Sequence, residues 1–158
     1  MRKQFQRGWA LILALSGIAT DLAAGEVTSL VLINADSNQP VRELKNEDTI
    51  DLAKVGGNLN IIAKVRGDVG SVRFQLDGNS NFRTESTAPF ALAGDTNGNF
   101  NRWTPKTGER TIVAIPFSQG QARGNKGKAL SITFTVTGKP DSTLPPIKYP
   151  QLEDCLLY

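Results

Sequence analysis

The stretch LSITFTVT at residues 130–137 alternates apolar and polar side chains with a period of two. In an extended chain this period places the apolar side chains on one face and the serine and threonines on the other. Residues 59–65 and 71–77 repeat the pattern, and residues 113–117 show it as far as Pro116. Because proline cannot donate to a strand ladder, we expect an edge or a bulge at the end of that strand. The pattern predicts half-buried antiparallel strands.

Turn-forming residues separate these strands at intervals of about a dozen positions, and no window after residue 25 has a convincing helical period. Weaker strand candidates lie at residues 27–33, 41–44 and 90–92. The turn clusters are residues 34–40, 56–57, 66–68, 77–81, 94–101 and 120–127. Short strands at this spacing predict an all-β fold, an immunoglobulin-like antiparallel β-sandwich of about seven strands. No disulfide can brace it, because Cys155 is the only cysteine.

The first 25 residues predict a secretory signal peptide. Three cations (Arg2, Lys3 and Arg7) precede an apolar run at residues 9–19, and small residues follow at 23–25. Residues 17–19 are a competing cleavage region. The run is shorter than the roughly 20 apolar residues of a membrane-spanning helix, so no transmembrane segment is expected after cleavage. We expect a secreted, periplasmic or cell-surface protein.

Three segments follow from this interpretation: a leader at 1–25, a sandwich domain at 26–138 and a proline-rich tail at 139–158. Prolines at 140, 145, 146 and 150 favour an extended tail. We expect this tail to be disordered; the alternative is a short docking peptide at its end. Cys155 lies in this tail, where it is a free thiol or pairs between molecules.

Charge argues against nucleic acid as a partner. The chain has 18 Lys and Arg against 15 Asp and Glu. Three of these cations and one anion, Asp21, precede Gly25, so 15 cations and 14 anions remain, a formal charge of +1. The basic character therefore belongs mostly to the leader, and no block of like charges remains for phosphate binding.

Four segments resemble bacterial immunoglobulin-like domains. They are VRFQLDG at 72–78, TAPF at 87–90, GERTIVAIPF at 108–117 and ITFTV at 132–136. The resemblance covers residues 69–138 well and 27–66 loosely. It implies an accessory or spacer module of the kind found in exported multidomain proteins that are often carbohydrate-active or adhesive. No catalytic domain accompanies the module here, so we expect it to act alone or with a separately encoded envelope protein.

Catalysis is poorly supported by the residue types. The chain has no histidine, which removes the commonest general base and metal ligand. Glu85 and Asp95 are the carboxylate pair that we nominate for acid–base work on a glycosidic bond. Carboxylates on the solvent faces of a sandwich usually only keep it soluble. We therefore expect a protein that is not an enzyme and has no cofactor.

An oxygen-rich stretch is the weak candidate for calcium. Asp95, Asn97, Asn99 and Asn101 present side-chain oxygens at every second position, as calcium loops do. Phe100 stands where such a loop needs glycine, and its closing glutamate is replaced by Lys106, so an EF-hand is rejected. Asn and Asp also form ordinary turns without an ion.

Trp103 leads the tentative ligand-binding residues, because an exposed indole can stack on a sugar ring. Asn99, Asn101 and Arg102 are the polar groups beside it. The competing interpretation is that Trp103 plugs the rim of the sandwich.

Arg123, Lys126 and Lys128 form a second candidate, in a glycine-rich loop at 118–128 that could meet an acidic polysaccharide. Its alternative is a mobile connection. The tripeptide at 66–68, Arg-Gly-Asp, matches an integrin-binding sequence, but three-residue matches arise easily by chance and a turn between two strands explains the glycine adequately. The leading hypothesis is an exported, non-catalytic module that binds or presents a ligand at the cell envelope, with carbohydrate as the expected class. The alternative is a purely structural or protein–protein interaction domain, an adhesion or spacer module without a small-ligand site.

Overall fold

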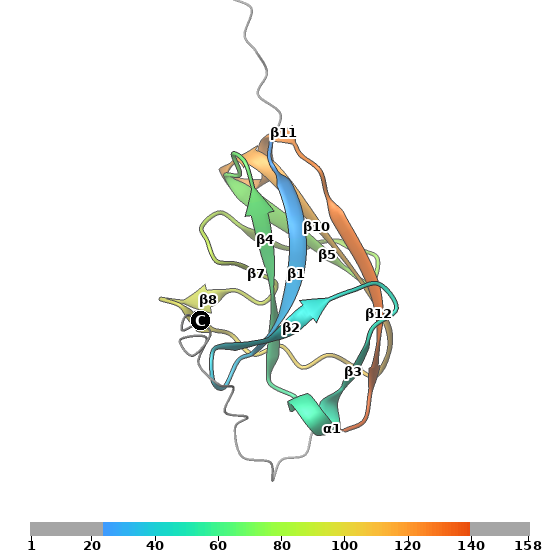
Figure 1. The fold of residues 1–158 in the computed structure, drawn as a ribbon. Coiled ribbons are helices and arrows are strands. Elements are labelled where there is room, and N and C mark those ends of the chain that lie inside the picture. Colours follow the sequence, from blue (N-terminus) through green and yellow to red (C-terminus); the bar gives the residue numbers. More distant parts are fainter. Residues whose placement is uncertain (1–23, 140–158) are drawn as a thin grey trace, which may run out of the picture.

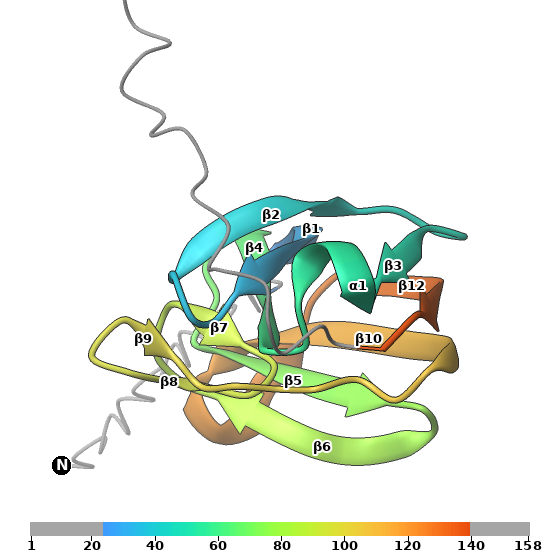
Figure 2. The same ribbon diagram turned by 90° about the horizontal axis from the view of Figure 1, so that it is seen from below.

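The computed structural model describes residues 24–139, which form a β-sandwich (Figure 1). Figure 2 shows the two layers, with β1, β2 and β4 on one side and β5, β6 and β10 on the other. The predicted leader up to residue 23, and the tail with Cys155, lie outside the described residues. Within residues 24–139, the helices are all too short to cross a membrane.

The first sheet has four strands, ordered β2 (Gln39–Leu44), β1 (Glu26–Asn34), β4 (Leu59–Arg66) and β7 (Phe90–Ala91). All its pairings are antiparallel. The second sheet is ordered β3 (Thr49–Asp51), β12 (Leu130–Thr137), β10 (Gly108–Gln119), β5 (Ser71–Leu76) and β6 (Asn79–Glu85), and β11 (Arg123–Lys126) also pairs with β10. Here β3 runs parallel to β12 and the other pairs are antiparallel.

This topology is immunoglobulin-like, as predicted. In the lettering of immunoglobulin domains, β1, β4 and β7 occupy positions A, B and E of one sheet. In the second sheet β3, β12, β10, β5 and β6 occupy A′, G, F, C and C′. The described residues form more strands than the seven or so expected. The additional strands are short: β3, β7, β11 and the two strands of a hairpin, β8 (Asp95–Thr96) and β9 (Asn99–Phe100), have only two to four residues each.

The core lies between the sheets and is formed by the apolar halves of the alternating strands. Leu30 and Ile61 of the first sheet are fully buried. Phe74, Ile112 and Phe134 of the second sheet have exposed fractions of 1 % or less. A smaller cluster on the outer face of the first sheet joins Ile33, Ile62 and Ala91, with Phe100 of the β8–β9 hairpin packed against it. Burial of these side chains is the main stabilising contribution to the fold.

Pro116 does not end its strand; β10 continues to Gln119. On one side β10 pairs with β12 only as far as Ala114 and with β11 from Phe117 onward. The Pro116 carbonyl accepts a hydrogen bond from the Gly127 N–H on that side (2.9 Å). The missing proline N–H therefore falls in the gap between two partner strands. The expected irregularity is a register shift against β11 just beyond the proline.

Two elements depart from the sequence-based expectation. A single helical turn, α1 (Leu52–Val55), follows β3, and the Asp51 carboxylate caps it by accepting from the Ala53 N–H (3.1 Å). Four residues are too few to show a helical period. The glycine-rich loop at 118–128 is largely ordered: β10 runs into it, a 3₁₀ turn, η1 (Gly120–Ala122), follows, and β11 pairs back onto β10.

The described chain begins inside the fold, at Ala24. Gly25 donates its N–H to the Asp68 carbonyl (2.9 Å) and accepts from the Lys128 N–H (3.1 Å). It therefore joins the turn at 66–68 to the link between β11 and β12. The Arg-Gly-Asp tripeptide forms this turn. Its Gly67 has φ +83°, and a Cβ added to Gly67 would lie 3.1 Å from the Gly25 Cα.

Candidate functional site

Trp103 is part of the rim of the sandwich, as the plug interpretation proposed. The Trp103 backbone N–H donates to the Leu59 carbonyl (2.7 Å), and the Trp103 carbonyl accepts from the Leu59 backbone N–H (3.1 Å). The side chain is half-buried and packs against the main core. These contacts hold the Trp103 backbone beside the start of β4 and place part of the indole against the core.

A hollow of about 210 Å³ lies beside this ring. It will be called the Trp103 hollow, and its lining residues are Leu76, Asp77, Trp103, Thr104, Lys106 and Arg110. Strand pairing assembles it: Leu76 lies opposite Ile112 in the β5–β10 ladder, and the Asp77 N–H donates to the Thr111 carbonyl (2.9 Å). This register brings Asp77 beside Arg110, near the loop that carries Trp103.

The Arg110 guanidinium, which lines the hollow, makes three contacts with neighbouring chain segments. It pairs with the Asp77 carboxylate at 2.7 Å, and it donates to the Lys106 and Thr107 carbonyls at 2.9 and 3.1 Å. The second Asp77 oxygen accepts from the Thr111 N–H (3.0 Å). These groups are therefore structural. The Lys106 ammonium, in contrast, makes no ion pair with any residue in the described range.

The polar residues predicted beside Trp103 do not line the hollow. The Asn101 amide donates to the Ala93 carbonyl (3.1 Å), and Asn99 accepts from the Asn38 amide (2.9 Å). Arg102 pairs with Asp36 at 2.8 Å. All three hold the segment between β7 and Trp103 in place, and the structure does not bring them together with the exposed part of the indole.

The calcium candidates form a tight turn. Asn97, at φ +53°, and Gly98, at φ +82°, are the two central residues of the β8–β9 hairpin. The Asp95 carboxylate accepts from the Gly98 N–H (2.7 Å), which is the ordinary role of Asp in a turn. Residues 24–139 contain no group of three or more acidic, Cys or His side chains placed to hold a metal ion.

The basic residues of the 118–128 segment have different surroundings. Arg123 donates to the Gly120 carbonyl (3.4 Å) and Lys126 is on β11. Lys128 lies 3.5 Å from the Glu26 carboxylate, which Arg66 also pairs with. The hydrogen bond and positive charge of Arg66, with a smaller effect of Lys128, hold the pKa of Glu26 below its usual value. One of the three predicted cations is thus committed to an internal contact.

The nominated catalytic carboxylates are not paired with each other. Glu85, on β6, accepts a hydrogen bond from Arg83, while the Asp95 carboxylate belongs to the β8–β9 turn.

Sequence reasoning did not identify Asp77 and Arg110 as residues of the hollow. It considered Lys106 only as the residue that replaces the closing glutamate of a calcium loop. Asp77 and Arg110 are 33 positions apart and meet through the β5–β10 register. The sequence patterns identify both strands but not which residues of one oppose which residues of the other. The one signal in the sequence was the opposite charge of Asp77, just after β5, and Arg110, near the start of β10.

The fold defines the chain as an all-β, immunoglobulin-like sandwich module. No protein-family model matches it, and no curated protein is found to be similar to it. Among solved structures, it is similar to the fibronectin(III)-like modules of CbhA from Clostridium thermocellum. That match has a TM-score of 0.40 and 16 % identity, and covers 71 % of this chain and 94 % of the other.

Proposed function

We propose that this protein is an exported, non-catalytic module that binds carbohydrate at the cell envelope through the Trp103 hollow. Export rests on the predicted leader at residues 1–25. The observation that carries the binding proposal is a half-buried indole that packs against the core and also lines a hollow with Asp77, Lys106 and Arg110. An aromatic ring with nearby polar groups is the usual means of stacking and orienting a sugar.

The size of the hollow limits the ligand. At about 210 Å³ it is smaller than the roughly 300–1,000 Å³ typical of drug-sized ligand pockets. It therefore has room for one sugar unit of a longer chain rather than for an enclosed oligosaccharide. Such a shallow contact suits a module that holds a polymer at its surface.

The charge of the hollow favours an acidic sugar. Arg110 and Asp77 neutralise each other, which leaves the Lys106 ammonium and the Thr104 hydroxyl for a ligand. An ammonium group and a ligand carboxylate form a charge-assisted hydrogen bond, which is about twice as strong as a neutral one. We therefore expect glycans that contain uronic acids to bind more tightly than neutral glycans.

Tryptophan fluorescence tests this proposal directly. The chain has two tryptophans, so in a Trp9→Phe background all indole emission comes from Trp103. Titration with an oligogalacturonate is expected to give a saturable change in emission, and titration with a neutral xylo-oligosaccharide a weaker one. Lys106→Gln is expected to weaken binding of the acidic glycan about tenfold.

Lys64→Gln is the matched control, because Lys64 is exposed on β4 and is not among the residues that line the hollow. This variant should bind like the parent. Unchanged emission with every glycan, or equal losses in the Lys106 and Lys64 variants, contradicts the proposal.

A second function, protein–protein interaction, is favoured by a separate observation at the edge of the first sheet. That edge shares no residue with the Trp103 hollow.

A further inference from the structure

β4 loses its neighbour partway along one edge. From its start, this edge is occupied by Trp103 opposite Leu59, and then by Leu92, whose N–H donates to the Ile61 carbonyl (2.7 Å). Phe90 is opposite Ala63, where the β4–β7 ladder ends. Lys64, Val65 and Arg66 have no strand on this side within residues 24–139.

The backbone of Val65 is the open position. In an antiparallel ladder the N–H and C=O of alternate residues point to the same side. Since Ile61 and Ala63 point their groups toward β7, Val65 directs its own to the same side, beyond the last β7 pair. Neighbouring Lys64 has its carbonyl on the opposite side, where it accepts from the Thr28 hydroxyl (3.2 Å). An unpaired N–H and C=O at a sheet edge are a template for another strand.

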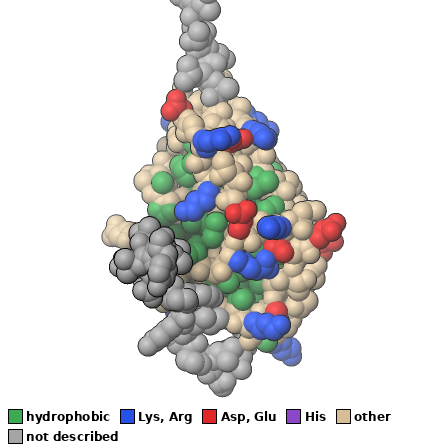
Figure 3. Space-filling view, in the orientation of Figure 1, with side chains coloured by type: hydrophobic (Ala, Val, Ile, Leu, Met, Phe, Trp, Pro, Cys, Tyr) green, Lys and Arg blue, Asp and Glu red, His purple; other side chains and the backbone are tan. Residues whose placement is uncertain are grey.

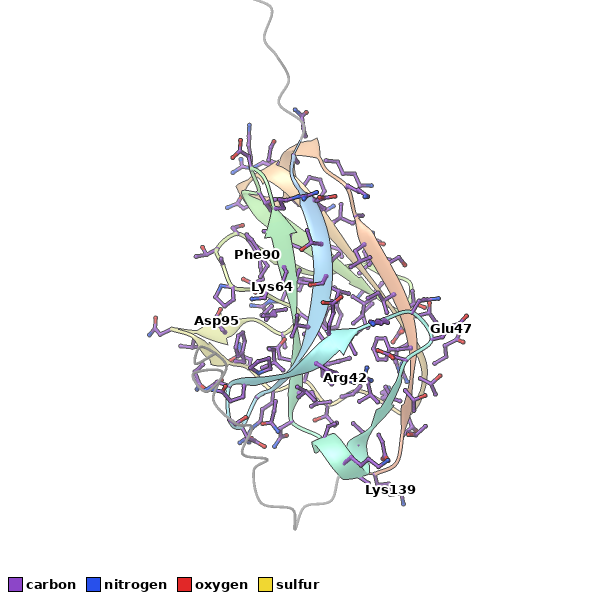
Figure 4. All side chains as sticks on the ribbon, in the orientation of Figure 1. Arg42, Glu47, Lys64, Phe90, Asp95 and Lys139 are labelled. Atoms are coloured by element: carbon purple, nitrogen blue, oxygen red, sulfur yellow. The ribbon has the colours of Figure 1, made fainter. Side chains whose placement is uncertain are left out.

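An apolar groove lies where the ladder stops. It has a volume of about 400 Å³, within the range of ligand pockets. Its lining residues are Ile62, Ala63, Lys64, Val65, Ala88, Pro89 and Phe90. Figure 4 shows Lys64 and Phe90 close together on this side of the molecule, and in Figure 3 hydrophobic side chains gather on the same face, with basic side chains among them.

The charge around the open edge is positive. No acidic side chain lines the groove. Lys64 and Arg66, on either side of Val65, are exposed, and Arg66 shares the Glu26 carboxylate with Lys128. With Asp68, which is exposed two residues beyond Arg66, these three cations and two anions give a formal local charge of +1. Two copies of this edge would bring like charges together, so the charge disfavours pairing of the chain with itself.

We propose that this edge binds an extended, acidic peptide segment of a partner protein by strand addition. The peptide backbone pairs with Val65, and an apolar side chain of the peptide enters the groove against Pro89 and Phe90. Its carboxylates face Lys64, which makes no ion pair within residues 24–139. In this binding mode the backbone provides affinity, and the groove and charges provide selectivity. The inference does not depend on carbohydrate binding, because the Trp103 hollow and the groove share no residue.

A pair of synthetic peptides tests the proposal with the full chain. One peptide alternates glutamate with valine and phenylalanine; in the other, lysine replaces glutamate. Fluorescence anisotropy of labelled peptides is expected to show binding of the acidic peptide and at least about tenfold weaker binding of the basic one. Lys64→Glu, an exposed change that leaves the core intact, is expected to weaken binding of the acidic peptide about tenfold. Lys139→Glu, at an exposed position that lines neither the groove nor the Trp103 hollow, is the control and should bind normally.

Amide hydrogen exchange locates the contact. The Val65 amide is expected to become protected when the acidic peptide is added, while the Trp103 amide stays unchanged. Equal binding of both peptides, no binding of either, or normal binding by Lys64→Glu overturns the proposal. Dimers in sedimentation velocity that Lys64→Glu abolishes or strengthens would also overturn it, because the occupant would then be a second copy.

Discussion

The side-chain amide of Asn60 donates a 2.8 Å hydrogen bond to the carbonyl of Asn101, 41 positions further along the chain. The same amide donates to the Gly94 carbonyl (3.0 Å), and the Asn60 side-chain oxygen accepts from the Ala93 N–H (3.1 Å). Asn60 is fully buried on β4. One polar side chain therefore holds both ends of the segment that contains the β8–β9 hairpin and leads to Trp103.

Replacement of Asn60 is expected to be costly. Asn60→Ala removes the side-chain partner of the Asn101 carbonyl and of the Ile61 and Ala93 N–H groups. Because Asn60 is fully buried, we expect a loss of about 3 kcal/mol of unfolding free energy. Urea unfolding measures this. Asn99→Ala, at an exposed position that bonds only Asn38, should cost less than about 1 kcal/mol. Equal losses in the two variants would show that Asn60 does not hold the segment.

Gly25 and Gly127 approach each other so closely that we expect Gly127 to tolerate no side chain. A Cβ built on Gly127 would lie 1.9 Å from the Gly25 carbonyl oxygen and 2.8 Å from that of Ala24. Both are backbone atoms that cannot rotate away, so Gly127→Ala should destabilise the protein by about 2 kcal/mol or more. A Cβ on Gly120 would meet only Ser86, at 3.7 Å. Gly120→Ala should therefore change the melting temperature very little; a similar fall in both variants would contradict this packing.

Acid should destabilise the fold in part through Asp48. Burial alone would raise its pKa, but the Lys45 N–H and the Arg42 guanidinium outweigh that effect and hold the pKa below its usual 3.8. A group whose pKa is lowered on folding stabilises the protein above its unfolded pKa and stops doing so as the pH falls through the folded value. Unfolding free energy should thus fall below about pH 4. Asp48→Asn should lower stability at neutral pH and reduce this acid dependence; an unchanged acid dependence would rule out the contribution of Asp48.

The main strands could be predicted because each puts one face in water and one in the core. Residues 59–65, 71–77 and 130–137 carry that alternation openly, and β4, β5 and β12 form there. The short strands could not be predicted in this way. β3 has three residues and β7 has two, and both are held by pairing with strands far away in the sequence, which no local pattern records.

The candidate site could be predicted only in part, for a related reason. Trp103 was identified by its chemistry, but its polar neighbours in the sequence point elsewhere. Asn101 bonds the backbone of Ala93, and Arg102 pairs with Asp36. The residues that do meet beside the ring come from β5, β10 and the loop between β9 and β10. Their meeting depends on strand register and on how the loop crosses the rim, both of which are properties of the tertiary structure.

The most direct test of the proposed function is an NMR titration of the ¹⁵N-labelled Trp9→Phe protein with an oligogalacturonate. If the Trp103 hollow binds carbohydrate, the single remaining indole N–H and the amides of Thr104, Lys106 and Asp77 will shift together and saturate, while those of residues 64–66 stay in place. Shifts confined to residues 123–128, or no shift of the indole with acidic or neutral glycans, would contradict the assignment of carbohydrate binding to this hollow.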